Sequence, residues 1–229
     1  MEQGGINIMD SIKYLKLDLR IIKGKIKISL ILPIFIGMMI IFMNNTAIAG
    51  IGYLLYLLIG LAKMPFDSSI SENSNEMYGL FPAKVSSMVL GRFIYLICAA
   101  LIIFFMDTVI IEYLYKVKAI SMDGIIGIFL SEIITLAICF CQYPIYYKLG
   151  IEKGKILSIM IYLIPGIVVF SLTSFISKNN VNTNASEILN FILNNRLTLV
   201  PMALLTCTII GIISYIISCN ICAKKELQS

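Results

Sequence analysis

Residues Pro65–Arg92, PFDSSISENSNEMYGLFPAKVSSMVLGR, form the longest polar interruption in a chain that is otherwise almost continuously apolar. Ser and Asp side chains early in this stretch can cap a helix, and Glu72 and Glu76 lie one turn apart, where carboxylates near a helix start are favourable. Gly79 and Pro82 would end such a helix. The stretch predicts a short helix outside the membrane that forms a contact surface. A solvated loop between two membrane helices is the alternative.

The composition indicates a membrane protein. Hydrophobic residues make up 59% of the 229 residues and charged residues 14%, whereas soluble domains average about 45–50% and about 25%. The net charge of +5 does not indicate a nucleic-acid partner, because the basic residues lie in short loops beside apolar runs. The sequence therefore predicts an all-α integral membrane protein built as one bundle.

Residues 1–27 are predicted to form a cytoplasmic amphipathic elbow helix. Apolar residues recur there at alternating steps of four and three, and Lys and Arg occupy much of the remaining surface. The apolar positions are Ile8, Ile12, Leu15, Leu19, Ile22 and Ile26. This pattern fits a basic helix in the inner membrane interface. The helix either moves with a partner or only anchors the chain.

Six apolar runs within residues 28–221 predict six transmembrane helices, although the first two are short and a single re-entrant hairpin is their alternative. The predicted spans are Ile28–Met43, Ala47–Leu61, Met88–Ile111, Gly124–Tyr146, Leu157–Ile176 and Leu197–Ile221. With the N-terminus inside, fourteen of the 18 Lys and Arg lie on the cytoplasmic side. Both termini, the tail 222–229 and the loop 62–87 are therefore predicted to be cytoplasmic.

The longest outer loop contains a predicted extracellular helix at residues 184–195. It starts with Asn184-Ala-Ser186, and apolar residues follow at helical spacing. Such a helix either caps a pathway or simply closes the loop.

Residues for enzyme chemistry are scarce. The chain has no His, which removes the usual general base and the commonest metal ligand. Its six Cys lie within or at the ends of the spans, and the Cys219–Cys222 spacing lacks the second pair of a zinc site. Gly150-Ile-Glu-Lys-Gly154-Lys-Ile156 lacks one residue between the glycines and the Ser or Thr of a P-loop. We expect no catalytic residue, no metal and no cofactor in this chain.

Glu132 is the ionisable residue deepest within a predicted span, and Asp107 lies nearer the outer end of its own. Glu132 could attract a cationic substrate or bond across a helix pair, and a hydrogen bond to Ser or Thr within the bundle is the alternative. The two carboxyls are far apart in sequence, which does not favour a proton relay. Pro144 is expected to close the fourth span.

Two motifs carry a family resemblance. The first runs through Glu72-Asn-Ser-Asn-Glu76-Met, Leu80-Phe-Pro-Ala-Lys84 and Val89-Leu-Gly-Arg92-Phe. The second is Gln142-Tyr-Pro-Ile-Tyr-Tyr-Lys148-Leu-Gly150-Ile-Glu152-Lys153, at the inner end of the fourth span. Together with the six spans, they resemble the markers of bacterial ABC-2 type transporter permeases. Phe81, Ala83 and Ser86 depart from the usual pattern, which leaves the docking preference open.

The short length without a fused ATPase is most similar to the permeases of bacterial peptide exporters, including those for phenol-soluble modulins and those that protect against antimicrobial peptides. The resemblance implies an ABC-2 (type V exporter-like) permease fold in the bacterial inner membrane. It also implies a second permease copy or paralogue and two separate ATPase subunits, which would bind ATP and Mg. The loop 62–87 would then be the coupling loop.

Eleven residues are the predicted ATPase-coupling residues: Glu72, Asn75, Glu76, Met77, Tyr78, Pro82, Lys84, Arg92, Lys148, Glu152 and Lys153. We expect the loop helix to insert into the ATPase and the third span to transmit its movement. The pathway would lie between two copies, and its candidate residues are Phe35, Phe42, Tyr53, Tyr56, Glu132 and Phe170. The competing classes are a membrane sensor or assembly protein and an ion-coupled carrier, although no internal repeat supports the carrier.

Overall fold

The computed structural model describes residues 9–23, 35, 39, 47–68, 85–118, 120, 122–178 and 196–226. Between residues 151 and 197, the described side chains are those of Lys153 and Ile156. The predicted first span, apart from residues 35 and 39, and the predicted extracellular helix at 184–195 lie outside the described residues. Every regular element among the described residues is a helix, which confirms the all-α prediction.

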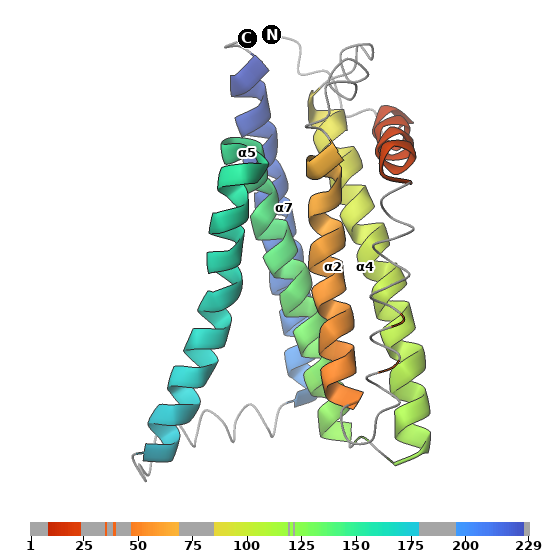
Figure 1. Cartoon of the computed structure of the whole chain (residues 1–229), viewed down its shortest axis with the longest axis vertical. Coiled ribbons are helices and arrows are strands. Elements are labelled where there is room, and N and C mark those ends of the chain that lie inside the picture. The colour runs from red at the N-terminus through yellow and green to blue at the C-terminus, as the bar shows by residue number, and fades with distance from the viewer. Residues whose placement is uncertain are drawn as a thin grey trace.

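Four long helices form the bundle in Figure 1. They are α2 (Ala47–Ser68), α4 (Val85–Lys116), α5 (Met122–Lys178) and α7 (Arg196–Glu226). The chain runs up α2, down α4, up the first half of α5, down its second half and up α7 (Figure 1). The end of α2, the start of α4 and the end of α7 therefore lie at one end of the bundle, which we call the upper end.

Three described helical segments are long and apolar enough to cross a membrane: Ser86–Lys116, Gly124–Gly150 and Thr198–Lys224. They coincide with the predicted third, fourth and sixth spans. The predicted second span lies in α2, and the predicted fifth lies in the second half of α5. The total of six spans stays a prediction.

Gly150 reverses the chain within α5. Its backbone has φ 72° and ψ 179°, a combination that essentially only glycine adopts. In Figure 1 the two halves of α5 diverge downward from this bend. The expectation that Pro144 closes the fourth span is wrong, because the helix continues through the proline to the glycine. A proline within a transmembrane helix is tolerated when neighbouring groups satisfy the freed backbone carbonyl.

The main core lies between α2, α4, the first half of α5 and α7, and α5 and α7 make the most extensive helix pair. Its members include Leu58, Leu96, Cys139 and Tyr143, none of which is more than 2% exposed. A second apolar cluster, which includes Ile51, joins α2, α4 and α5 near the lower end. Outside these clusters, large apolar side chains point outward along α4 and α7. This surface suits lipid, in which outward apolar groups carry no penalty.

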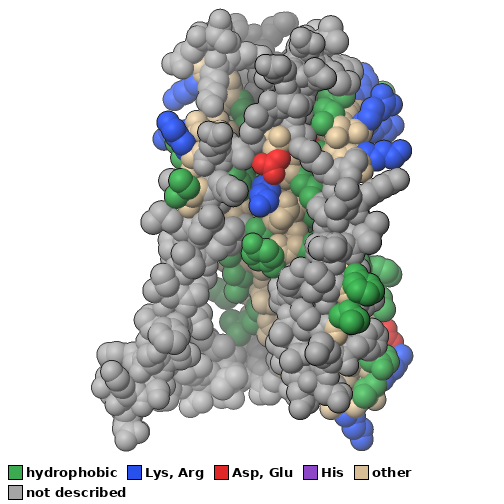
Figure 2. Space-filling model, viewed as in Figure 1, with side chains coloured by type: hydrophobic (Ala, Val, Ile, Leu, Met, Phe, Trp, Pro, Cys, Tyr) green, Lys and Arg blue, Asp and Glu red, His purple; other side chains and the backbone are tan. Residues whose placement is uncertain are grey.

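Charged side chains follow the ends of the bundle. In Figure 2 the described Lys and Arg gather over the upper part and at the lower end, and none is visible in the belt between. The exposed pair Lys116–Glu112, at 2.7 Å, lies at the end of α4. This distribution is typical of a protein whose apolar belt faces hydrocarbon.

Residues 9–23 form the N-terminal helix. It is seen almost end-on at the upper end in Figure 1, so it lies across the bundle helices. Its buried residues are Ser11, Tyr14, Leu17, Asp18 and Ile22. Ile12 and Leu19, from the predicted apolar face, are instead 40% and 41% exposed. The buried side of the helix is therefore partly polar, and its exposed side carries apolar residues together with Lys13, Lys16, Arg20 and Lys23. Its position in the membrane interface stays a prediction.

Substitution of Gly150 tests the bend. We expect Gly150→Ala to lower the free energy of unfolding by about 1–3 kcal/mol, because alanine must adopt a glycine-only conformation. Among the described residues, no heavy atom lies within 4 Å of the new Cβ, so the loss is conformational rather than steric. Thermal unfolding of the full chain in detergent, followed by circular dichroism, measures it.

Gly127 provides the matched control within the same helix. A Cβ there also meets no atom of the described residues within 4 Å, and its φ is not positive. Gly127→Ala should therefore be neutral or slightly stabilising. Equal midpoints for both variants would contradict the interpretation of Gly150 as a strained bend.

Candidate functional site

The two family-like motifs meet at the upper end of the bundle. Gly91 and Arg92, from the first motif, lie in the second turn of α4, and the Tyr residues of the second lie near the end of the first half of α5. α2 ends at Ser68 and α4 begins at Val85, so these residues lie at the end of the bundle where the predicted coupling loop leaves and rejoins the described helices. The site is thus built from four elements: the N-terminal helix, α2, α4 and α5.

Gly91 allows the N-terminal helix to touch α4. A Cβ atom at Gly91 would lie 2.8 Å from the backbone oxygen of Ser11 and 3.0 Å from the Cβ of Tyr14. Cβ atoms essentially never approach a neighbour as closely as the first of these distances, so the two backbones can meet only where the side chain is missing. Small residues at helix crossings serve this purpose in membrane proteins.

Arg92 and Asp18 form a buried ion pair across this contact. The Nε of Arg92 lies 3.8 Å from Oδ2 of Asp18, and the side chains are 6% and 1% exposed. A single buried charge is very costly, whereas a pair offsets part of the desolvation through mutual attraction. The pair therefore fixes the position of the N-terminal helix along α4.

Aromatic rings surround the guanidinium group. Its central carbon lies 4.8 Å from the ring centroid of Phe66 and 5.6 Å from that of Tyr147, which is within the range of cation–π attraction. Phe66 also packs edge-on against Tyr143 and Tyr147, with centroids 5.1 and 5.0 Å apart. We call Asp18, Phe66, Arg92, Tyr143 and Tyr147 the Arg92 cluster.

Hydroxyl groups tie the helices of the cluster to one another. The Tyr143 hydroxyl donates to the backbone oxygen of Arg92 at 3.3 Å, which joins α5 to α4. The Tyr95 hydroxyl donates to the backbone oxygen of Leu61 at 3.4 Å, which joins α4 to α2. Deeper in the bundle, the Ser214 hydroxyl donates to the backbone oxygen of Phe140 and joins α7 to α5. The two helices that flank the coupling loop are thus held in one unit.

Most of the predicted coupling residues cannot be placed. Those outside the described residues are Glu72, Asn75, Glu76, Met77, Tyr78, Pro82 and Lys84. Lys148 and Lys153 are exposed on either side of Gly150, and Glu152 lies in α5 with its side chain not described. Arg92, by contrast, is 5% exposed. Any part that Arg92 plays in coupling therefore acts through the Arg92 cluster rather than through direct contact with another subunit.

The predicted pathway residues lie in different surroundings. Phe35 and Tyr56 are 65% and 68% exposed. Tyr53 and Phe170 lie in α2 and α5, with side chains that are not described. Phe42 lies outside the described residues. The described residues thus do not bring these candidates together in one lining.

Glu132 is buried, with 2% of its surface exposed, and Asp107 is fully buried. The carboxyl of Asp107 is close enough to interact electrostatically with that of Glu132, so the fold brings together two groups that are far apart in sequence. The neighbouring Ser131 and Thr135 hydroxyls donate to the backbone oxygens of Ile128 and Ser131. These two hydroxyls are therefore not used to bond the carboxylate.

Asp18 and Phe66 were not predicted as site residues, and Tyr143 and Tyr147 were noted only within the second motif. Asp18 stands among basic residues, and Phe66 follows the proline of a helix end. One usable signal was the crowding of Tyr143, Tyr146 and Tyr147 onto one and a half helical turns, together with an Arg inside a predicted span. Among the described residues, no group of three Cys, Asp or Glu could hold a metal ion.

Gly91→Ala tests the close contact. The added methyl group must push the N-terminal helix away from α4, and we expect the free energy of unfolding to fall by about 1–3 kcal/mol. Gly60→Ala in α2 is the control, because no atom in the described part of the chain lies within 4 Å of a Cβ there. Thermal midpoints in detergent measure both variants. An unchanged midpoint for Gly91→Ala would show that the two helices do not touch.

Arg92→Met tests the buried ion pair. Leaving Asp18 buried opposite an uncharged side chain should cost about 3–5 kcal/mol, and Asp18→Asn combined with Arg92→Met should cost less than the sum of the two single changes. Lys116→Met is the control, because its partner Glu112 is exposed and no measurable change is expected. Denaturant unfolding in micelles gives the coupling energy, and strict additivity would refute the pairing.

No curated protein and no solved structure matches the chain. The family described as ABC-2 family transporter protein matches residues 14–223, which includes the whole Arg92 cluster. The membrane subunits of this family are not themselves catalytic, and they act with a partner ATPase subunit. With nearly its full length matched, the chain belongs to the ABC-2 family of transporter proteins and is a transmembrane permease subunit of an ABC transporter.

Proposed function

We propose that this permease exports amphipathic peptides of the antimicrobial or cytolytic kind, or lipid-like molecules, out of a bacterial cell. Two copies of a separate ATPase would supply the energy by docking on the loop 62–87. A second permease copy or a paralogue would complete the pathway. Both termini would lie in the cytoplasm.

The observation that carries the coupling part of this proposal is the Arg92 cluster. Phe66 lies two residues before the end of α2, and Arg92 lies seven residues after the start of α4. Both are held by Tyr143 and Tyr147 of α5. A force applied to the loop therefore reaches α2, α4 and α5 together, as a rigid element requires.

The distribution of Lys and Arg between the two ends of the bundle supports the cytoplasmic location of the loop. Lys63, Arg92, Lys148 and Lys224 all belong to the upper end of the bundle, where the N-terminal helix with its basic residues also lies (Figure 1). Lys116 and Lys118 belong to the lower end. An excess of Lys and Arg at one end favours the cytoplasm for that end.

The substrate class rests on the likeness of this short permease, which has no fused ATPase, to peptide exporters and on the chemistry of the interior. The exposed rings of Phe35 and Tyr56 would suit an apolar peptide face, if the pathway lies between two permease copies. The buried carboxyls of Asp107 and Glu132 would favour a cationic group over an anionic one. Membership of a transporter family that works with an ATPase favours an exporter permease over a sensor, an assembly protein or an ion-coupled carrier.

The loop is tested with the triple variant Glu72→Ala, Glu76→Ala, Tyr78→Ala. Coexpressed with the candidate ATPase and purified in detergent, the wild-type permease should retain the ATPase, and the variant should lose it by about tenfold or more. The double variant Glu112→Ala, Tyr115→Ala removes the same types of side chain at the lower end and should retain the ATPase. Equal recovery with the triple variant would remove the loop from the coupling mechanism.

Transport is measured with the same pair in inverted membrane vesicles. An amphipathic, cationic helical peptide should accumulate only when hydrolysable ATP is present. Accumulation of a labelled phospholipid but not of the peptide would favour the lipid-like substrate. If neither moves although the ATPase is bound and active, the export proposal fails while the coupling loop stands.

A further inference from the structure

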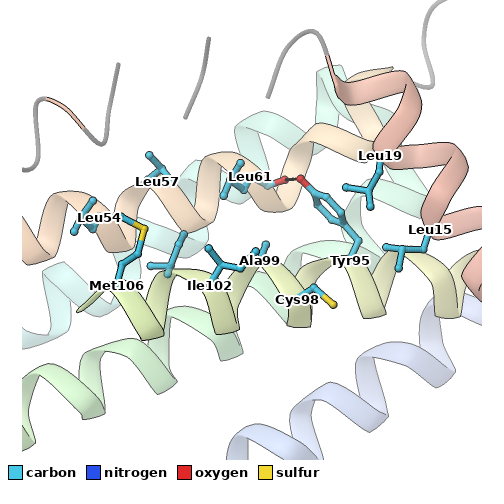
Figure 3. Close-up of a pocket in the computed structure, with 11 residues that line it drawn as sticks. Leu15, Leu19, Leu54, Leu57, Leu61, Tyr95, Cys98, Ala99, Ile102 and Met106 are labelled. Atoms are coloured by element: carbon cyan, nitrogen blue, oxygen red, sulfur yellow. Dashed lines mark hydrogen bonds between the residues drawn. The ribbon is translucent and has the colours of Figure 1, made fainter. Parts of the chain in front are cut away.

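An apolar groove lies between the N-terminal helix, α2 and α4, apart from the Arg92 cluster (Figure 3). Its volume is about 300 Å³. Leu15 and Leu19 line it from the N-terminal helix, and Leu54, Leu57 and Leu61 line it from α2. The α4 residues of the lining are Tyr95, Cys98, Ala99, Ile102, Ile103 and Met106. We propose that this groove binds one acyl chain of an anionic phospholipid, whose phosphate meets the basic side chains of the N-terminal helix.

The shape of the groove fits a single hydrocarbon chain. Its lining on α4 extends from Tyr95 to Met106, a length of about 16 Å along the helix axis. A volume of about 300 Å³ spread over that length leaves a trough much thinner than the 10–12 Å diameter of an α-helix. The trough runs parallel to the spanning segment Ser86–Lys116, which is also the direction of lipid chains in a bilayer.

The chemistry of the lining also favours a hydrocarbon chain. Tyr95 is the one residue of the lining with a polar side-chain group other than the thiol of Cys98, and its hydroxyl already donates to the backbone oxygen of Leu61, as the dashed line in Figure 3 shows. An extended peptide in the groove would find no free partner for its backbone groups, which is costly in an apolar site. Apolar cavities of this kind also stay dry. A hydrocarbon chain fills the groove without such a cost.

Charge at one end indicates the headgroup. Leu15, Leu19 and Lys23 follow one another at steps of four, so they lie on the same face of the N-terminal helix. Lys16 and Arg20 lie beside this face, and all three basic residues are exposed. The groove thus has basic side chains only at the end where it meets the N-terminal helix, within the part of the chain that is described. An acyl chain in the groove would place its phosphate at that end, where basic residues attract anionic lipid.

Native mass spectrometry tests the proposal on the full chain, after reconstitution in nanodiscs that contain equal amounts of phosphatidylglycerol and phosphatidylcholine. We expect one retained phosphatidylglycerol per chain. Ala99→Phe fills the groove and should reduce this retention by about tenfold, the effect of losing roughly two methylene contacts. Ile97→Phe adds the same ring on α4 outside the groove, at a position that is 43% exposed, and should retain the lipid.

Two further variants keep the test decisive. If Ala99→Phe does not fold, Ile102→Trp serves instead, because Ile102 lines the groove yet is 63% exposed and tolerates a larger side chain. Arg20→Gln with Lys23→Gln should abolish the preference for phosphatidylglycerol, whereas Lys118→Gln at the lower end should not. Retention that is equal in the filled variants, or no lipid retained by the wild type, overturns the site. Retention without headgroup preference overturns the anionic part. The outcome is independent of the transported substrate, since it needs neither ATPase nor transport.

Discussion

The arrangement at the upper end of the bundle depends on the buried charge of Arg92. A guanidinium group that is removed from water must have a carboxylate, aromatic faces or both within reach, or the fold loses several kcal/mol. Asp18 supplies the carboxylate, so the N-terminal helix must cross α4 at that point. Position 91 must then hold a glycine, because the two backbones touch there. One buried charge thus fixes the crossing of the N-terminal helix and brings the ends of α2 and α5 around it.

A second constraint comes from the bilayer. All backbone groups in hydrocarbon must form hydrogen bonds within the chain, and the described elements are accordingly helices. Apolar side chains can point outward into hydrocarbon without penalty. Asp107 and Glu132 break this pattern because they are carboxyls buried in spanning segments. Carboxyls at such depth persist only where function or pairing compensates for the cost. Their proximity means that they affect each other, so neither can be interpreted alone.

Much of the fold was predictable from the sequence, and the failures have physical causes. Apolar runs placed the third, fourth and sixth spans correctly because length and hydropathy decide whether a helix crosses a membrane. The prediction that Pro144 closes the fourth span was wrong, because a packed membrane helix tolerates a proline. The helix instead ends at Gly150, whose φ is positive. Arg92 was predicted to be an ATPase-coupling residue, but its side chain is only 5% exposed. Asp18, 74 residues earlier, pairs with it only in three dimensions.

The way these features combine limits how the permease can move. The Arg92 cluster and the tyrosine hydroxyl bonds hold α2, α4 and the first half of α5 in one unit, so the loop between α2 and α4 cannot shift without carrying that unit with it. Gly150 is different, because it is a bend with no atom of the described residues within 4 Å of its Cβ position. Packing limits the angle a few residues further on, because a Cβ at Gly154, after the bend, would lie 3.0 Å from the ring of Tyr146, before it. Movement of that unit would therefore reach the second half of α5 both through the backbone of Gly150 and through the contact of Tyr146 with Gly154.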